Sequence, residues 1–136
     1  MNIIVCLDDK NGMLFNHRRQ SMDQAVRQRI LSITAGKTLW MNGYTAKQFT
    51  EPAGQIAVAE DFLSCAENDD FCFLEKDHVD PYQDKIQKIV VYRWNRVYPA
   101  DTFFPAGYLT QRISTFEFPG NSHEKITEEV YQICEK

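Results

Sequence analysis

Five short apolar segments most constrain what this chain can fold into. Each is rich in aliphatic or aromatic residues and too short for a helix, so each has the character of a buried strand. The stretches between them have the composition of turns and helices. Strands separated by helical connections indicate a mostly parallel sheet covered on both faces. The five segments are residues 2–7, 38–41, 55–58, 71–74 and 88–92.

Helices are expected between these strands. Ser21 followed three residues later by Gln24 is a capping-box pattern, and the apolar residues after it recur at helical spacing until about Gly36. Residues 13–20 before it have the character of a loop. The remaining expected helices are shorter: residues 44–49, residues 61–67 and a short piece around Tyr82.

The last third of the chain carries two further predictions. Residues 89–97 and 109–118 are longer segments with branched and aromatic side chains, which favours an antiparallel pair at one side of the sheet. Ile126, Val130, Ile133 and Cys134 then recur at helical intervals, and Asn121 with Glu124 offers a second cap. This pattern predicts a C-terminal helix.

Composition bounds the class of protein. A chain of 136 residues with 43% hydrophobic content suits one domain, residues 1–136, around a single core. The formal net charge of −4 disfavours general binding to nucleic acid or to anionic membrane, so any anion site must be local. The first residues lack the basic start of a secretory signal, and no apolar run is long enough to cross a bilayer. We therefore expect a cytoplasmic protein, of an oligomeric state that the sequence does not indicate.

The cysteines and histidines argue against a metal site. The cysteines are widely spaced, which is typical of reduced, buried thiols. No His-x-His or His-Glu-x-x-His spacing is present to place two imidazoles on one metal. We expect neither a metal nor another cofactor. The residues concerned are Cys6, Cys65, Cys72, Cys134, His17, His78 and His123.

Polar clusters at the ends of the expected strands predict a ligand site. Arginines match phosphate or carboxylate oxygens bidentately, and tryptophan and tyrosine rings can stack on a base. An arginine-lined cleft would bind a small anionic or nucleotide-like ligand, although the same arginines could instead be solvated or paired with surplus acids. The candidate ligand-binding residues are Arg18, Arg19, Asp23, Trp40, Asn42, Tyr92, Arg93, Asn95 and Arg96, with Trp94 as a further stacking face.

A second hypothesis is catalytic. His123, oriented by Glu124, or His17 could act as general acid or base in metal-independent phosphodiester cleavage, with the arginines stabilising charge. The alternative for His123 is a surface or capping role. No motif such as Gly-x-Ser-x-Gly identifies an activated nucleophile.

The order and spacing of several segments resemble dihydrofolate reductases. The likeness rests on residues 3–8 with 11–13, the helix from Ser21, residues 36–42 and the acidic-Thr-x-Phe-Pro pattern at residues 101–105. It implies an α/β fold of three αβα layers around a mostly parallel, mixed sheet. The resemblance would also place a strand at the C-terminal end, whereas the residue pattern there indicates a helix.

Departures from the family pattern imply that reductase chemistry is lost. Glu75 and Lys76 stand where the family has two adjacent glycines, joined by a cis peptide, against the dinucleotide pyrophosphate. Gly43, and Glu60 with its acidic neighbour, stand where the family binds the 2′-phosphate. Asp23 lies within one residue of the family's pterin-binding carboxylate, or is a first-turn helix acid. Weak or absent NADPH binding is expected, with residual NADPH-dependent reduction as the alternative.

In the pterin pocket, the resemblance places Tyr92 where the family prefers Thr. Its ring would intrude on the space of the folate ring. The chain is also similar to short bacterial proteins, some labelled ribonuclease Z, through residues 12–21, 92–101 and 122–127. That label implies His-x-His-x-Asp-His metal ligands, which this sequence lacks.

Overall fold

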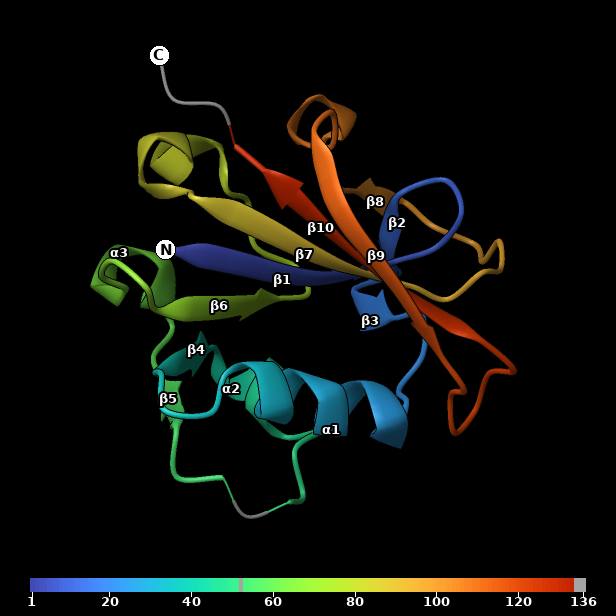
Figure 1. Cartoon of the computed structure of the whole chain (residues 1–136), viewed down its shortest axis with the longest axis horizontal. Helices are drawn as coiled ribbons and strands as arrows, with labels where there is room; N and C mark the ends of the chain where they lie inside the picture. The colour runs from blue at the N-terminus through green and yellow to red at the C-terminus, as the bar shows by residue number, and fades with distance from the viewer. Residues whose placement is uncertain (52, 134–136) are drawn as a thin grey trace.

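A computed structural model describes residues 1–51 and 53–133. Its centre is a seven-stranded sheet (Figure 1). The first five strands in spatial order are parallel, β10 runs antiparallel to them, and β9 runs antiparallel to β10 at the edge. In spatial order the strands are β5 (Ile56–Val58), β4 (Leu39–Met41), β6 (Phe71–Leu74), β1 (Asn2–Leu7), β7 (Lys88–Arg93), β10 (Ile126–Gln132) and β9 (Arg112–Phe118).

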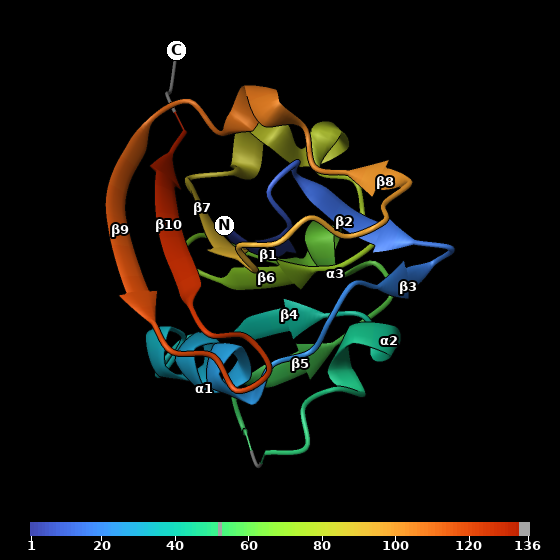
Figure 2. The same ribbon diagram turned by 90° about the vertical axis from the view of Figure 1, so that its right-hand side faces the viewer.

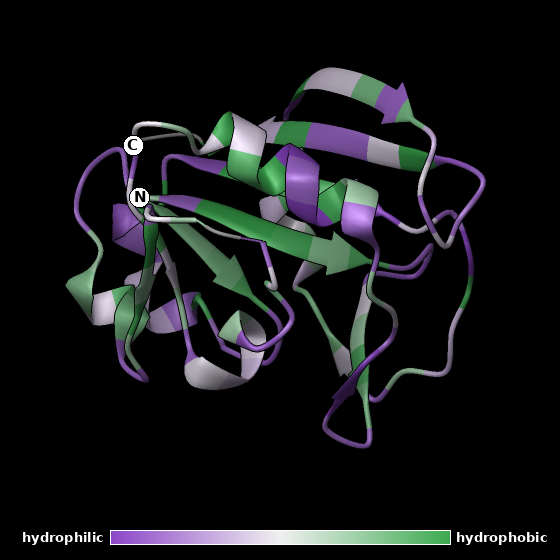
Figure 3. Ribbon diagram, turned by 90° about the horizontal axis from the view of Figure 1, so that it is seen from below, coloured by the Kyte–Doolittle hydropathy of each residue, from purple (hydrophilic) through white to green (hydrophobic). Residues whose placement is uncertain are grey.

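Helical elements cover both faces of this sheet, giving three layers. On one face, Val26 and Ile30 of α1 (Gln24–Ile33) pack against Ile4 and Val90 of the central strands. On the other face, α3 (Phe62–Cys65) and the 3₁₀ helix η1 (Asp80–Lys85) cover a second apolar cluster, which includes Ile3 and Val5 of β1. Apolar residues concentrate in the central strands (Figure 3). The expected α/β three-layer class with a mostly parallel, mixed sheet is confirmed.

The loop expected at residues 13–20 contains strands. β2 (Gly12–Phe15) pairs with β3 (Arg18–Arg19) on one side and with β8 (Thr102–Phe103) on the other, forming a small second sheet. The hairpin turns at Asn16 and His17, which both have positive φ. This small sheet lies beside the carboxyl ends of the central strands (Figure 2).

Helix α1 begins later than the capping-box pattern predicted. Its N-cap is Asp23, whose carboxylate accepts hydrogen bonds from the amides of Ala25 and Val26. Ser21 therefore does not cap the helix. Helices α2 (Gly43–Ala46) and α3 are shorter than predicted, whereas the short helical piece expected around Tyr82 is present as η1. A further 3₁₀ turn, η2 (Ala106–Tyr108), precedes β9.

The prediction of a C-terminal helix is wrong, because Ile126–Gln132 forms strand β10 between β7 and β9. Ile126 and Val130, four residues apart, share one face of a strand as readily as one face of a helix, so their spacing did not discriminate. The proposed cap at Asn121 and Glu124 belongs to the β9–β10 loop. The expected pairing of β7 with the segment at 109–118 is also wrong, since β10 lies between them.

The described cysteines are all free thiols. Cys72 is buried, whereas Cys6 and Cys65 are partly exposed, and Cys134 lies outside the described residues. Burial, with Glu75 and Asp23 nearby, raises the pKa of the Cys6 thiol. Across residues 1–51 and 53–133, no helix is long and apolar enough to span a membrane.

Candidate functional site

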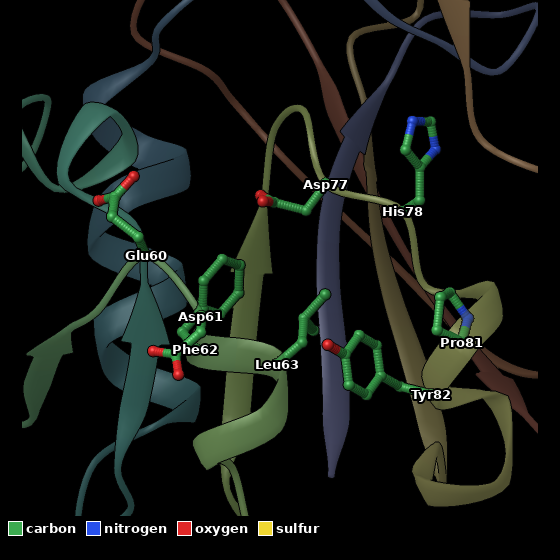
Figure 4. Close-up of a pocket in the computed structure, with 8 residues that line it drawn as sticks. All are labelled: Glu60, Asp61, Phe62, Leu63, Asp77, His78, Pro81 and Tyr82. Carbon is green, nitrogen blue, oxygen red and sulfur yellow. The ribbon is translucent and has the colours of Figure 1, made fainter.

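An open, acidic cavity of about 270 Å³ lies at the carboxyl ends of the parallel strands (Figure 4). Open α/β sheets bind ligands at this edge. Asp77, after β6, points across the opening toward Glu60, after β5, while Phe62, Leu63 and Tyr82 form its floor. Burial raises the pKa of Asp77, with Glu60 a further cause. The lining residues are Glu60, Asp61, Phe62, Leu63, Asp77, His78, Pro81 and Tyr82.

The first turn of α2, beside this cavity, is already capped by internal groups. The Gly43 amide donates to Oε2 of Glu60 at 2.9 Å, and the Thr45 amide donates to Oδ1 of Asn42 at 2.9 Å. Asn42 also donates its Nδ2 to Asp77 at 3.3 Å. The amides that begin a helix are its anion-binding donors, so a carboxylate of the chain itself takes the place open to an external anion.

Glu75 fixes the β2–β3 hairpin over the end of β6. Its carboxylate accepts two hydrogen bonds from the Arg19 guanidinium, from Nε at 2.8 Å and from Nη2 at 3.0 Å. The guanidinium also donates to the Tyr44 carbonyl and lies over the Tyr44 ring at 4.3 Å. Burial would lower the pKa of Arg19, but the bonds to Glu75 raise it. The hairpin is thereby held down on α2 and β6.

Behind this ion pair, the space between the β2–β3 hairpin and the carboxyl ends of β1 and β6, which we call the cleft, is almost filled. A cavity of only about 10 Å³ remains, room for no more than about one water molecule. Gln20 lines this cavity, and its buried amide oxygen has no hydrogen-bond partner within the described residues. The lining residues are Cys6, Met13, Arg19, Gln20, Ser21, Leu74, Glu75 and Trp94.

Asp23 is enclosed by the β9–β10 loop. Besides the helix amides, its carboxylate accepts the amides of Asn121 and Ser122 at 2.9 and 2.8 Å, and it lies 3.3 Å from Nδ1 of His123. Burial alone would raise the pKa of Asp23, but these hydrogen bonds outweigh it and lower the pKa to about 2. A Cβ on Gly120 would lie 2.8 Å from the Asp23 carboxylate, so the loop closes this tightly only with glycine there.

His123 is a buried part of this loop. Its ring stacks on Trp94 with centroids 4.6 Å apart, and its side chain is only 2% exposed. Nε2 lies 2.8 Å from the Tyr98 hydroxyl, and Nδ1 faces Ser122 and Asp23. Both ring nitrogens are therefore engaged internally. Glu124, by contrast, is exposed.

Tyr92 fills the α1 side of the cleft. It is fully buried, and its hydroxyl donates to Glu128 at 2.8 Å, while Arg29 donates two bonds to the same carboxylate. Burial and the Glu128 charge raise the pKa of Tyr92 well above its usual value. The resemblance assigned Asp23 and Tyr92 to a pterin pocket; here Asp23 is bonded to the β9–β10 loop and Tyr92 is buried against Glu128.

The four candidate arginines do not share one cleft. Arg19 is paired with Glu75, and Arg93 is turned to the other face, where it donates to Glu129 and to the Asn11 side chain. Arg18 is exposed on the hairpin.

Two other candidate residues lie apart from the arginines. The indole of Trp40 donates to Asp70 at the amino end of β6, away from the carboxyl edge. His17 is exposed at the hairpin turn.

Arg96 contributes to a separate opening of about 350 Å³, which we call the basic pocket. Asn95, which has a φ of +60°, donates to the Lys125 carbonyl and to the Thr127 hydroxyl. These bonds hold the segment after β7 against the β9–β10 loop, so Arg96 and Lys125 come to the same pocket. Its lining residues are Trp94, Asn95, Arg96, His123, Glu124 and Lys125.

Sequence reasoning missed several residues that shape these sites. Tyr44, Tyr98 and Glu128 gained their roles only through long-range contacts, since their partners lie 25 or more positions away. Asp77 had a usable signal, because it closely follows a buried strand in an α/β pattern. Across the described ranges, no three His, Cys, Asp or Glu side chains gather in a way that could hold a metal ion.

Comparisons with known proteins identify the fold. No family model and no curated protein matches the sequence. The structure is similar to that of dihydrofolate reductase from Enterococcus faecalis complexed with NADP(H) and RAB-propyl. The TM-score is 0.69 with 11% sequence identity, and the match covers 98% of this chain and 96% of that chain. A likeness at this identity establishes the fold alone, and the expected dihydrofolate reductase-like fold is confirmed.

Proposed function

We propose that this chain is a binding protein of dihydrofolate reductase-like fold that has no reductase activity. The observation that carries the proposal is that the carboxylates of Glu60 and Glu75 accept hydrogen bonds from groups of the same chain. Glu60 takes the Gly43 amide, and Glu75 takes the Arg19 guanidinium, at the two loops where the resemblance places the phosphates of NADPH. A cofactor phosphate would meet negative charge where it needs donors.

The residues present do not fit NADPH for a second reason. The open cavity at this edge is lined by Glu60, Asp61 and Asp77, and the burial of Asp77 already disfavours the charge it carries. Lys76 is the cation next in sequence, but its ammonium group lies toward the Tyr44 ring, 5.3 Å from the centroid. Adding phosphate charge would increase the repulsion.

The pterin side is equally disfavoured. Asp23, the carboxylate that would bind a pterin, uses its acceptor capacity on α1 and on the β9–β10 loop. Tyr92 and Trp94 fill the neighbouring volume. A folate could enter only if the loop and both rings moved together.

We further propose that the ligand is a small anion, such as a phosphorylated metabolite or a nucleotide, held in the basic pocket. Arg96 is exposed and makes no ion pair within the described part of the chain, and Lys125 pairs only with the exposed Glu117 at 3.3 Å. The lining thus offers Arg96 without an ion-pair partner in the described residues, beside Lys125, which shares its charge with Glu117, and Glu124. Asn95 fixes its geometry.

The experiment is a titration with inorganic phosphate, AMP and ADP, followed by heteronuclear NMR. The amides around Arg96 and Lys125 should shift saturably in the wild type and much less in Arg96→Ala. Arg18→Ala, which removes an exposed arginine on the β2–β3 hairpin, is the matched control and should bind like wild type. Equal shifts in all three proteins, or none in any, would contradict the anion site. Oxidation of NADPH by dihydrofolate would contradict the proposed loss of reductase activity.

Phosphodiester cleavage is the second candidate, and one observation favours it. The Asp23 carboxylate, the His123 ring and the Tyr98 hydroxyl form a hydrogen-bonded chain of the kind that orients a general base. Burial of the ring opposes it, because a substrate has no open path to either nitrogen. RNA cleavage that is lost in His123→Gln and in Tyr98→Phe would support this function, and an inactive wild type would end it.

A further inference from the structure

Strand β9 is an outer edge of the large sheet (Figure 2). On one face the Arg29 guanidinium of α1 lies over the Phe116 ring, 4.6 Å from its centroid. Six of its seven residues are exposed, including Ile113 at 54% and Phe116 at 47%. Within the described residues, its strand neighbour is β10 on one side and none on the other. An exposed edge of this length presents unpaired backbone donors and acceptors to another strand.

A β-bulge places opposite charges on the same face of β9. Glu117 and Thr115 stand opposite Thr127 and Glu129 of β10, which share one face. The register shifts between Ser114 and Arg112, so that Arg112 stands opposite Tyr131 on that same face and reaches Glu129 at 3.3 Å. Without the bulge, Arg112 and Glu117 would point to opposite faces.

We propose that β9 pairs antiparallel with β9 of a second copy of this chain. A two-fold axis that relates adjacent antiparallel strands stands perpendicular to the sheet, so each face continues into the same face of the other copy. With the axis at Thr115 and Ile113 as the extra residue of the bulge, Arg112 of each copy lies beside Glu117 of the other, where it shares that carboxylate with Lys125. On the opposite face, each Phe116 lies across from Ser114 and is covered by the neighbouring strand.

The charge pattern selects a second copy and the antiparallel direction. In-register parallel pairing would place Arg112 beside Arg112 and Glu117 beside Glu117, which is repulsive. The other sheet edge, β5, has only three residues. Pairing through one seven-residue strand buries less than the roughly 800 Å² per partner of a standard interface, so the dimer should be weak, with a dissociation constant of about 10 µM to 1 mM.

Charge reversal tests the pairing by sedimentation velocity over a concentration series. Arg112→Glu and Glu117→Arg should each weaken the dimer by about tenfold, since each converts both attractive pairs into repulsive ones. An equimolar mixture of the two variants should recover the wild-type constant, because the carboxylate introduced into one chain then meets the guanidinium introduced into the other. Lys10→Glu, a reversal in the exposed turn after β1, is the matched control and should dimerise like wild type.

The mixture distinguishes lost pairing from lost folding, because misfolded variants would not recover. A wild type that remains monomeric up to about 1 mM would overturn the proposal. So would single reversals with the wild-type constant, or a mixture no stronger than either variant alone. A dimer that is insensitive to both reversals would place the contact on another surface and would equally overturn it.

Discussion

The ion pair between Arg19 and Glu75 should couple the β2–β3 hairpin to the central sheet. The two side chains are 19% and 9% exposed and share two hydrogen bonds of 2.8 and 3.0 Å. Hydrogen bonds to charged groups contribute about 1.5–3 kcal/mol each, and desolvation of both ions offsets part of this gain. We expect a coupling energy of about 2 kcal/mol.

A double-mutant cycle with Arg19→Met and Glu75→Met measures this coupling. Methionine keeps much of the length of both side chains, so the packing under the hairpin should change little. Glu75→Met alone should cost more than the double variant, because it leaves the partly buried guanidinium with only the Tyr44 carbonyl and ring. Urea denaturation at neutral pH gives each free energy of unfolding.

The pair between Arg27 and Glu51 is the matched control. It is similarly exposed, at 14% and 20%, but its hydrogen bonds are longer, at 3.3 to 3.4 Å. Its coupling energy should be about 0.5–1 kcal/mol. A coupling for Arg19 and Glu75 below about 0.5 kcal/mol, or no larger than the control, would refute the assignment of Glu75 as the group that closes the cleft.

Three further perturbations test the packing around the cleft. Because the pKa of Asp23 falls from 3.8 to about 2 in the folded protein, it contributes about 2 kcal/mol of stability. That contribution is fully present above pH 3.8 and is lost as the pH falls toward 2. Urea unfolding from pH 2 to 6 should show this loss of stability. In Asp23→Asn the free energy of unfolding should no longer carry this pH dependence. Asp77→Asn should raise the free energy of unfolding slightly, by less than about 1 kcal/mol, since it removes a partly buried charge beside Glu60; a lower free energy of unfolding would contradict this. Tyr92→Phe should cost about 1–3 kcal/mol, because the buried Glu128 loses a donor; an unchanged free energy of unfolding would show that Arg29 alone satisfies the carboxylate.

The strands at the centre of the fold could be predicted because their pattern leaves one interpretation. Ile3, Val5 and Leu7 pack on one face while Ile4 packs on the other, so a buried parallel strand must be apolar throughout. Short lengths and flanking turns then exclude helices.

The C-terminal strand could not be predicted from local spacing. Glu128 looked like a solvated helix residue, yet it is buried under Arg29, 99 positions away, and bonded to Tyr92. Only the tertiary partner determines that environment. The convergence of the four arginines is a different case, because successive strand residues face opposite sides of the sheet, which turns Arg93 away from the face that carries Tyr92.

Amide NMR of Gly43 during titration with NADPH tests the central claim most directly. If Glu60 holds this amide as the structure has it, the Gly43 resonance should stay in place up to millimolar NADPH, because its amide hydrogen is already bonded to a carboxylate. Saturable movement of the Gly43 and Glu75 amides in the wild-type protein at micromolar NADPH would contradict the account.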